Sequence, residues 1–233
     1  MMQNDPLSTE PLSIESGGTL ELFAQRATHG DVREPLAPGA VLLRGFAASK
    51  AAALLAEVQE ITARSPFRLM SARGYPMSVA MSNCGTTGWV TDEKGYRYDA
   101  IDPKTAMSWP QMPSSFRALG TAAAFEAGFE SFEPDACLLS RYAPGARLSL
   151  HQDKDERDLE SPIVSISLGL QAVFLFGGLR RSERPRRVPL AHGDVVVWGG
   201  PARLRFHGVL PLKDGSHPLL GACRVNLSLR KAR

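Results

Sequence analysis

The chain has 233 residues, of which 43% are hydrophobic and 22% charged, and its 27 Lys and Arg exceed its 24 Asp and Glu by three. This composition is typical of a folded protein and excludes a disordered or fibrous chain, and the length suits one large domain or two small ones. The longest apolar stretch, residues 163–178, is interrupted by Ser, Gly and Gln and is too short to span a membrane as a helix. We therefore expect no integral membrane protein.

The N-terminus lacks the basic-then-apolar pattern of a signal peptide, so export is not expected. Three scattered cysteines, Cys84, Cys137 and Cys223, fit neither a disulfide framework nor a CxxC zinc pair. We interpret them as reduced core thiols of a cytoplasmic protein. Residues 1–33, with five acids and two bases, predict a partly flexible tail.

Two helices are predicted in the first half of the chain. In the first, Ser49 is a candidate N-cap, apolar residues recur at three- and four-residue spacing over 54–61, and Pro66 ends the helix. The second begins at Pro113 and stops at Gly128.

After about residue 135 the sequence predicts short strands separated by turn signals. The candidate strands are 136–142, 147–153, 163–170, 172–176, 194–198, 204–209 and 223–230. Many short strands favour a sandwich or barrel over a doubly wound fold. The predicted class is mainly β with flanking helices (α+β).

Histidines followed two residues later by an aspartate are the first chemical clue. Such pairs occur at His29–Asp31, His151–Asp153 and His192–Asp194, and two residues at this spacing share one face of a strand. The first and third have a central Gly, which favours a turn; the second follows a predicted strand without Gly. Together with His207, it could form the two-histidine, one-carboxylate triad of non-haem Fe(II) oxygenases. On spacing alone, buried structural histidines remain an alternative.

The last predicted strand alternates strictly between polar and apolar residues. One face carries Arg224, Asn226, Ser228 and Arg230, and the other carries Val225, Leu227 and Leu229. Two arginines on one face of an interior strand would be costly without an anion, and guanidinium groups bind carboxylates bidentately. The pattern indicates a dicarboxylate clamp beside the triad, with a solvated outer face as the alternative.

With these motifs, the chain resembles the AlkB family of Fe(II)- and 2-oxoglutarate-dependent nucleic-acid demethylases, and its bacterial members above all. The resemblance runs from about Glu34 to Arg230. It rests on the segments SPFRLMSARGYPMSVAMSNCG, GWVTDEKGYRY, FEPDACLLSRYAPGARLSLHQDKDE, PIVSISLGL, FGGLRR, HGDVVVWGG and RVNLSLR. It implies a double-stranded β-helix (jelly roll) in a single domain over 34–233, with an N-terminal extension and nucleotide-recognition lid over about 34–134 and the jelly-roll core over about 135–233.

The resemblance also implies the site. His151, Asp153 and His207 would be the metal ligands and catalytic centre. Arg224 and Arg230 would bind the two ends of 2-oxoglutarate, with Tyr142, Asn226 and Ser140, where the family has Asn, beside them. Trp89 and the His151 ring would sandwich the damaged base, and Asp155 would face its exocyclic edge. Further substrate contacts would come from Met81, Tyr75, Met77, Ser71, Tyr96 and Arg181.

The implied activity is repair of DNA by oxidative demethylation of 1-methyladenine and 3-methylcytosine, which releases formaldehyde, succinate and CO2. The implied cofactors are Fe(II), 2-oxoglutarate and O2, with ascorbate as a reductant in vitro. The partners would be single-stranded DNA, with alkylated double-stranded DNA and RNA as further candidates, and the chain would be a monomer. Arg180, Arg181, Arg184, Arg186 and Arg187 form a candidate phosphate track or a solvated loop. The alternatives are a 2-oxoglutarate-dependent hydroxylase of a protein or small molecule, a non-catalytic reader of alkylated bases, and a zinc hydrolase.

Overall fold

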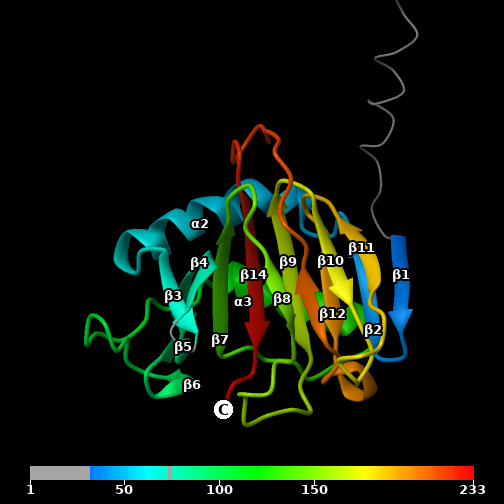
Figure 1. Ribbon diagram of the computed structural model, residues 1–233, viewed down its shortest axis with the longest axis horizontal. Helices are drawn as coiled ribbons and strands as arrows, with labels where there is room; N and C mark the ends of the chain where they lie inside the picture. The colour runs from blue at the N-terminus through cyan, green and yellow to red at the C-terminus, as the bar shows by residue number, and fades with distance from the viewer. Residues whose placement is uncertain (1–31, 73–74) are drawn as a thin grey trace, which may run out of the picture.

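Two β-sheets face each other in the computed structural model, which describes residues 32–72 and 75–233 (Figure 1). The predicted tail up to residue 31 and the His29–Asp31 pair lie outside these residues. The major sheet has eight strands in the order β1-β2-β12-β9-β14-β7-β4-β3. The minor sheet has the order β11-β10-β13-β8, and β5 pairs with β6 in a separate hairpin. This arrangement agrees with the predicted jelly roll and mainly-β class.

The strands of the major sheet are β1 (Val32–Ala37), β2 (Ala40–Arg44), β3 (Arg68–Ala72), β4 (Tyr75–Gly85), β7 (Ala136–Tyr142), β9 (Ile163–Gly169), β12 (Val195–Trp198) and β14 (Arg224–Arg230). The minor sheet contains β8 (Leu148–His151), β10 (Ala172–Phe176), β11 (Arg186–Leu190) and β13 (His207–Val209), and the hairpin joins β5 (Gly88–Asp92) to β6 (Gly95–Asp99). The helical elements are η1 (Ala48–Lys50), α2 (Ala51–Arg64), α3 (Ser114–Glu126) and η2 (Gly200–Ala202).

Both long helices cover the outer face of the major sheet. Figure 1 shows α3 behind the strands and α2 along their upper ends, and the apolar side chains of β14 share one core cluster with both helices. The opposite face of the sheet packs against the minor sheet in a second cluster that includes Phe174 and Trp198. Because alternate residues of a strand point to opposite faces, the polar residues of β14 face the space between the sheets. This placement confirms the predicted alternation.

The helix predictions are correct in position but wrong in one detail. Ser49 does not cap α2; it lies within the 3-10 turn η1, and no side chain caps either helix start. Helix α2 ends at Arg64, just before Ser65 and Pro66. Helix α3 begins after Pro113 and ends before Gly128, whose positive φ of 91° suits a glycine at a helix C-terminus.

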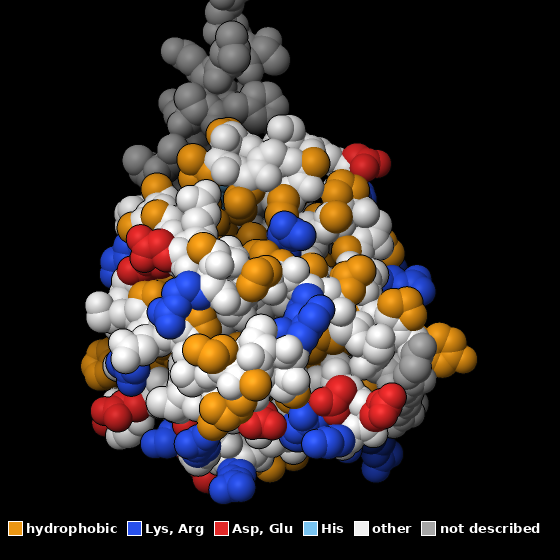
Figure 2. Space-filling model, turned by 90° about the vertical axis from the view of Figure 1, so that its left-hand side faces the viewer, with side chains coloured by type: hydrophobic (Ala, Val, Ile, Leu, Met, Phe, Trp, Pro, Cys, Tyr) orange, Lys and Arg blue, Asp and Glu red, His pale blue; other side chains and the backbone are white. Residues whose placement is uncertain are grey.

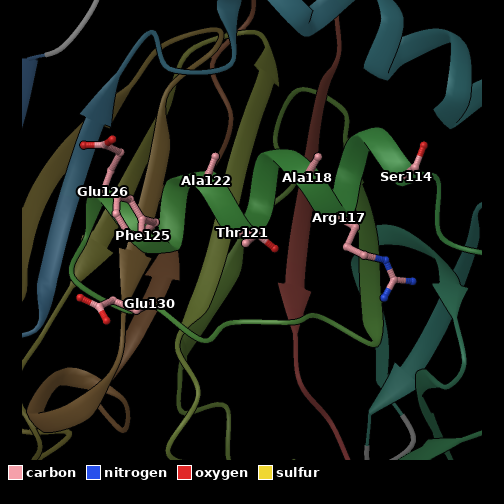
Figure 3. Close-up of a pocket in the computed structure, with 8 residues that line it drawn as sticks. All are labelled: Ser114, Arg117, Ala118, Thr121, Ala122, Phe125, Glu126 and Glu130. Carbon is pink, nitrogen blue, oxygen red and sulfur yellow. The ribbon is translucent and has the colours of Figure 1, made fainter.

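Two surface regions are set apart by the fold. A shallow hollow lies over the exposed face of α3, between Arg117 and Phe125 (Figure 3), on the helical side of the major sheet. At the end of the molecule formed by β3 to β6, basic and hydrophobic side chains are interspersed on the surface (Figure 2). The exposed hydrophobic side chains there include Leu69, Tyr75 and Tyr96. We call strands β3 to β6 the lid region below.

Within the described residues, no helix is long and apolar enough to cross a membrane. Cys84 and Cys137 are buried and Cys223 is half-buried, and all three are free thiols. The two buried cysteines lie directly opposite each other on β4 and β7.

Candidate active site

Three side chains, two from strands of the minor sheet and one from the loop after β8, converge on one point between the sheets. His151 is the last residue of β8 and His207 is the first residue of β13, and the two are paired across these antiparallel strands. Their ring centroids are 4.4 Å apart. Asp153 lies after the end of β8, so the predicted strand over 147–153 is wrong at its C-terminal end. One ligand atom from each of the three residues nevertheless lies within 4.8 Å of the others, a spacing that one metal ion can bridge.

Backbone carbonyls set the orientation of both imidazoles. Nδ1 of His151 lies 2.9 Å from the carbonyl oxygen of Ser149, and Nδ1 of His207 lies 3.0 Å from that of Arg205. Because a carbonyl only accepts, each Nδ1 carries the proton and each Nε2 keeps its lone pair. Nε2 of His151 lies 3.4 Å from Asp153 Oδ1, and Nε2 of His207 lies 3.7 Å from Oδ2. A hydrogen bond from Nδ1 to a backbone carbonyl is typical of histidines that bind a metal through Nε2.

Electrostatics hold Asp153 and His207 in the protonation states that metal binding needs. Burial would lower the pKa of His151, but its hydrogen bond and charge attraction to Asp153, with the Ser149 carbonyl, raise it. Burial alone would raise the pKa of Asp153, but Arg230 and the two imidazoles lower it well below its ordinary value. Burial, with His151 next in weight, lowers the pKa of His207. Near neutral pH the site therefore offers a carboxylate and a neutral imidazole.

Arg230, the last residue of β14, reaches the same point from the major sheet. Its NH2 lies 2.5 Å and its Nε 3.1 Å from Asp153 Oδ2. Both residues are largely buried, with 8% and 10% of their side chains exposed. The predicted clamp residue thus lies beside the predicted metal ligand, and the pair links the two sheets.

Arg224, at the start of β14, is a buried cation with incomplete hydrogen bonding. Its NH2 donates to Ser167 Oγ at 3.0 Å and to Asn226 Oδ1 at 2.7 Å, and its guanidinium lies 4.9 Å from the centre of the Tyr142 ring. Among the described residues, its Nε and NH1 have no hydrogen-bond partner, although the side chain is only 1% exposed. Burial lowers its pKa. Two inward-facing donors without a partner fit a carboxylate of a bound dicarboxylate.

The other predicted cosubstrate residues surround this arginine. Tyr142 is buried, which raises the pKa of its hydroxyl. Asn226 accepts a hydrogen bond from Ser165 at 3.1 Å as well as that from Arg224. Ser140 is buried and lies directly opposite Asn226 in the register of β7 and β14. The structure therefore brings these residues together at one end of the strand pair.

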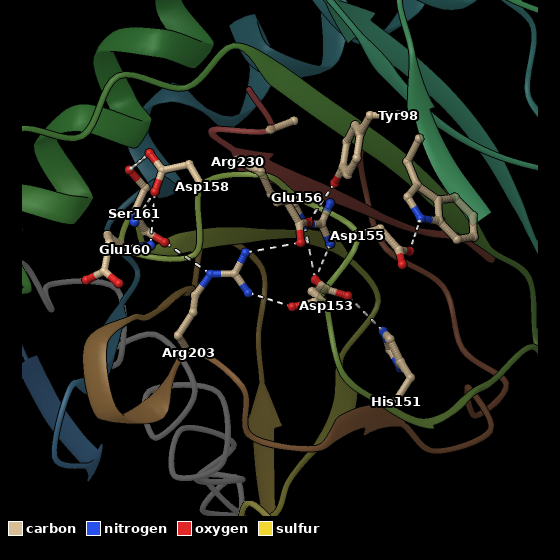
Figure 4. A network of polar contacts seen from close by, with 12 residues as sticks. Tyr98, His151, Asp153, Asp155, Glu156, Asp158, Glu160, Ser161, Arg203 and Arg230 are labelled. Carbon is tan, nitrogen blue, oxygen red and sulfur yellow. Dashed lines mark hydrogen bonds and ion pairs between the residues drawn. The ribbon is translucent and has the colours of Figure 1, made fainter.

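An aromatic pair of the β5–β6 hairpin lies near the loop that carries Asp153. Trp89 and Tyr96 stack with ring centroids 5.6 Å apart at an interplanar angle of 22°. Nε1 of Trp89 donates to Oδ2 of the exposed Asp155 at 3.0 Å (Figure 4). The hairpin thus contacts the segment that follows the metal ligands.

The remaining predicted substrate residues are spread more widely. Met81 is buried in the core between the sheets, and Met77 packs beside that core. Ser71 and Tyr75 are exposed on β3 and β4. Arg181 donates from NH1 to the carbonyl of Leu150 at 2.6 Å, next to His151.

The arginine run does not form one free basic loop. Arg186 and Arg187 belong to β11, a strand that sequence analysis missed, and Arg186 forms an ion pair with Glu34 at 2.6 Å. The phosphate-track interpretation is therefore weakened at that end. The His192–Asp194 pair is structural, as predicted: Asp194 accepts from the backbone N–H of Gly45 and of Ala191, both at 2.9 Å.

Sequence reasoning missed a buried polar network beside the site (Figure 4). Glu156 follows the exposed Asp155, but it is only 6% exposed and pairs with Arg230 and Arg203. Tyr98 of the hairpin donates its hydroxyl to the same carboxylate at 2.7 Å. Nothing in the sequence separates Glu156 from its exposed neighbours.

Comparisons with known proteins agree with this geometry. Residues 39–230 match the family model described as the 2OG-Fe(II) oxygenase superfamily. The chain is 56% identical over 214 residues to the alpha-ketoglutarate-dependent dioxygenase AlkB of Escherichia coli, an alignment that covers 91% of this chain and 98% of that protein. It is 36% identical over 131 residues to the human nucleic acid dioxygenase ALKBH1, covering 54% of this chain and 33% of the relative. The solved structure of OsALKBH1 superposes with a TM-score of 0.77 at 28% identity, covering 86% of this chain and all of that one. The chain therefore belongs to the 2OG-Fe(II) oxygenase superfamily and, within it, to the AlkB family of Fe(II)- and 2-oxoglutarate-dependent dioxygenases.

Proposed function

We propose that this dioxygenase removes methyl groups from ring nitrogens of alkylated bases, with 1-methyladenine and 3-methylcytosine in single-stranded DNA as its main substrates. The observation that carries the proposal is the stacked Trp89–Tyr96 pair, which is joined to Asp155 in the loop that follows the metal-binding histidine and aspartate. A flat aromatic surface beside an oxidising centre suits a base that has left the helical stack. The human relative's name as a nucleic acid dioxygenase supports the same substrate class.

In this proposal His151, Asp153 and His207 would hold Fe(II), as two histidines and one carboxylate do in other facial triads. Arg224 and Arg230 bind the two carboxylates of 2-oxoglutarate. Tyr142, Asn226 and Ser140 complete the cosubstrate pocket. The orphaned donors of Arg224 support this assignment, because a carboxylate would satisfy both of them.

When bound, Fe(II) with 2-oxoglutarate and dioxygen supplies the oxidising power for hydroxylation of the methyl group, with succinate and CO2 as products. The protein's own residues supply position and charge. Carbonyl-bound Nδ1 atoms hold both imidazoles in one orientation, and Arg230 keeps Asp153 ionised. Asp153 and His207 are shielded from water, with 10% and 6% of their side chains exposed, whereas His151 is more open at 35%.

Asp155 gives the site a preference for charged lesions. The bases 1-methyladenine and 3-methylcytosine are cationic near neutral pH, whereas the repaired bases are neutral. An exposed carboxylate next to the stacking surface attracts the cation and not the product. Trp89 and the His151 ring would enclose the base, with Tyr96, Met81, Met77, Tyr75, Ser71 and Arg181 as further contacts.

The lid region, in this proposal, is the nucleotide-recognition part of a single domain over residues 34–233, and its surface of interspersed basic and hydrophobic side chains supports contact with a nucleic-acid strand (Figure 2). We further propose a cytoplasmic monomer that accepts alkylated double-stranded DNA and RNA less readily than single strands. Extrusion of a base from a duplex adds an unpairing cost.

A product assay tests the substrate class. Succinate formation from 2-oxoglutarate should rise several-fold with an oligonucleotide that contains one 3-methylcytosine, and should stay at the basal rate with the unmethylated oligonucleotide. Equal stimulation by both would favour the alternative, a hydroxylase whose substrate is a protein or small molecule. Tight binding of the methylated strand without any succinate would favour a non-catalytic reader.

A further inference from the structure

Glu156 is a buried carboxylate that the proposed reaction does not use. It comes three residues after Asp153, in a loop whose neighbouring acids at 155 and 160 are exposed. Its Oε1 lies 3.1 Å from Nε of Arg230 and accepts the Tyr98 hydroxyl at 2.7 Å. Its Oε2 lies 3.2 Å from NH2 of Arg203. One carboxylate thus contacts the hairpin, the clamp strand and the segment before β13 (Figure 4).

Arg203 ties the same loop to the second histidine segment. It is 3% exposed and lies four residues before His207. Its NH1 donates to the backbone carbonyl of Asp153 at 2.7 Å, and its Nε donates to that of Ser161 at 3.1 Å. All three nitrogen atoms of the Arg203 guanidinium therefore contact the loop that carries Asp153. The side chain fixes the position of that loop relative to β13.

The charges of this cluster balance. Asp153 and Glu156 carry two negative charges, and Arg203 and Arg230 carry two positive ones. The proposed ligands, Fe(II) and the 2-oxoglutarate dianion, also sum to zero. Binding of both ligands therefore leaves the net charge of this cluster at zero, and Arg224, which lies outside the cluster, contributes one further buried positive charge.

Glu156 also controls which edge of Arg230 is available. Nε of Arg230 is shared between Asp153 and Glu156, and NH2 contacts Asp153. Among the contacts of the described residues, none uses NH1 of Arg230. If Glu156 lost its charge, the Arg230 guanidinium would be free to turn toward Asp153 alone. Its Nη1, which has no contact in the described residues, would then no longer be held in one orientation.

We propose that Glu156, supported by Arg203 and Tyr98, is a positioning residue that holds Arg230 in the orientation that binds the 2-oxoglutarate carboxylate. This role rests on the cosubstrate site proposed above and not on the nucleic-acid substrate. It can therefore fail while demethylation stands, and it can hold if the substrate proves to be another molecule.

The test measures 2-oxoglutarate binding without turnover. Protein loaded with Fe(II) under argon is titrated with 2-oxoglutarate, and binding is followed by the visible absorption of the Fe(II)–2-oxo acid chelate. Glu156→Gln keeps the size of the side chain but removes its charge, and it should weaken 2-oxoglutarate binding about 10- to 100-fold, the loss expected when a hydrogen bond to a charged group is removed. Glu160→Gln, the same change at an exposed position of the same loop, should leave the affinity unchanged.

Two further measurements separate positioning from general structural support. The Fe(II) affinity of Glu156→Gln, measured without 2-oxoglutarate, should change much less than the cosubstrate affinity. Unchanged 2-oxoglutarate affinity, or parallel losses of metal affinity and thermal stability, would overturn the proposal. Should Glu156→Gln fail to fold, Tyr98→Phe decides, because it removes one contact to Glu156 and no charge: a loss of severalfold in 2-oxoglutarate affinity supports the proposal, and wild-type affinity contradicts it.

Discussion

The partly unsatisfied guanidinium of Arg224 allows stability and function to be separated in one variant. Arg224→Met keeps much of the side-chain volume and removes the buried charge. We expect the ligand-free variant to be as stable as the wild type or more stable, and to have lost its response to 2-oxoglutarate. A residue retained only for folding would show the opposite on both counts.

The magnitude follows from the contacts of this residue. Substitution removes two hydrogen bonds, to Ser167 and Asn226, and also removes two buried donors without partners in the described part of the chain. A bond that involves a charged group contributes about 1.5–3 kcal/mol, and an unsatisfied buried donor costs about 1–3 kcal/mol, so these terms largely cancel. Because the desolvation cost of the cation is also removed, the free energy of unfolding should be equal to the wild-type value or higher by about 1–4 kcal/mol.

Thermal unfolding of the metal-loaded protein with and without 2-oxoglutarate measures both effects. A ligand at 100 times its Kd stabilises the native state by about 2.7 kcal/mol, which in a chain of this length raises Tm by about 5–11 °C. The wild type should show this rise and Arg224→Met should not. Arg141→Met is the matched control: Arg141 is exposed on the adjacent strand β7, opposite Val225, and its loss should leave the rise intact. A destabilised apo variant that still responds to 2-oxoglutarate would show that Arg224 supports folding and does not bind the cosubstrate.

Three further predictions concern other parts of the molecule. His207→Ala should lose stoichiometric iron and all turnover while keeping its fold, as checked by metal analysis and circular dichroism; full activity would exclude His207 as a ligand. Trp89→Ala should weaken binding of a methylated oligonucleotide about 5- to 150-fold, because stacking of one base contributes about 1–3 kcal/mol, and unchanged affinity would place the base elsewhere. Burial, and next His217, lowers the pKa of His192, so this residue contributes stability that is present above its ordinary pKa of about 6.5 and is lost as the pH falls through its lowered folded-state pKa. The unfolding free energy of the wild type should therefore fall more steeply with acid than that of His192→Gln, and parallel curves would contradict the shift.

The features that sequence predicts well are those with a strict period. Strands β7 and β10 have the predicted bounds, and β14 shows the predicted two-sided pattern, because each packs apolar side chains on a continuous core. The facial triad could be predicted because a histidine and an aspartate two residues apart, with a later isolated histidine, form a recognisable spacing.

Features that depend on tertiary contacts were missed. Strand β11 contains Arg186, Arg187 and Pro189, which read as a loop; proline is tolerated there because β11 is at the edge of the minor sheet. Glu156 lies in an acidic segment in which Asp155 and Glu160 are exposed, and only the approach of Arg203 and Arg230 from other parts of the chain makes its burial favourable. Local sequence contains no signal for contacts between segments this far apart.

In the proposed function, this site oxidises the methyl group of a nucleobase. Its most direct test is mass spectrometry of a single-stranded oligonucleotide with one 3-methylcytosine, incubated with the protein, Fe(II), 2-oxoglutarate and air, beside an RNA copy and the His207→Ala protein. We expect the methyl group to be lost from the DNA only when 2-oxoglutarate is present and His207 is intact. An intact methylated oligonucleotide, with steady succinate formation in the same tube, would contradict it.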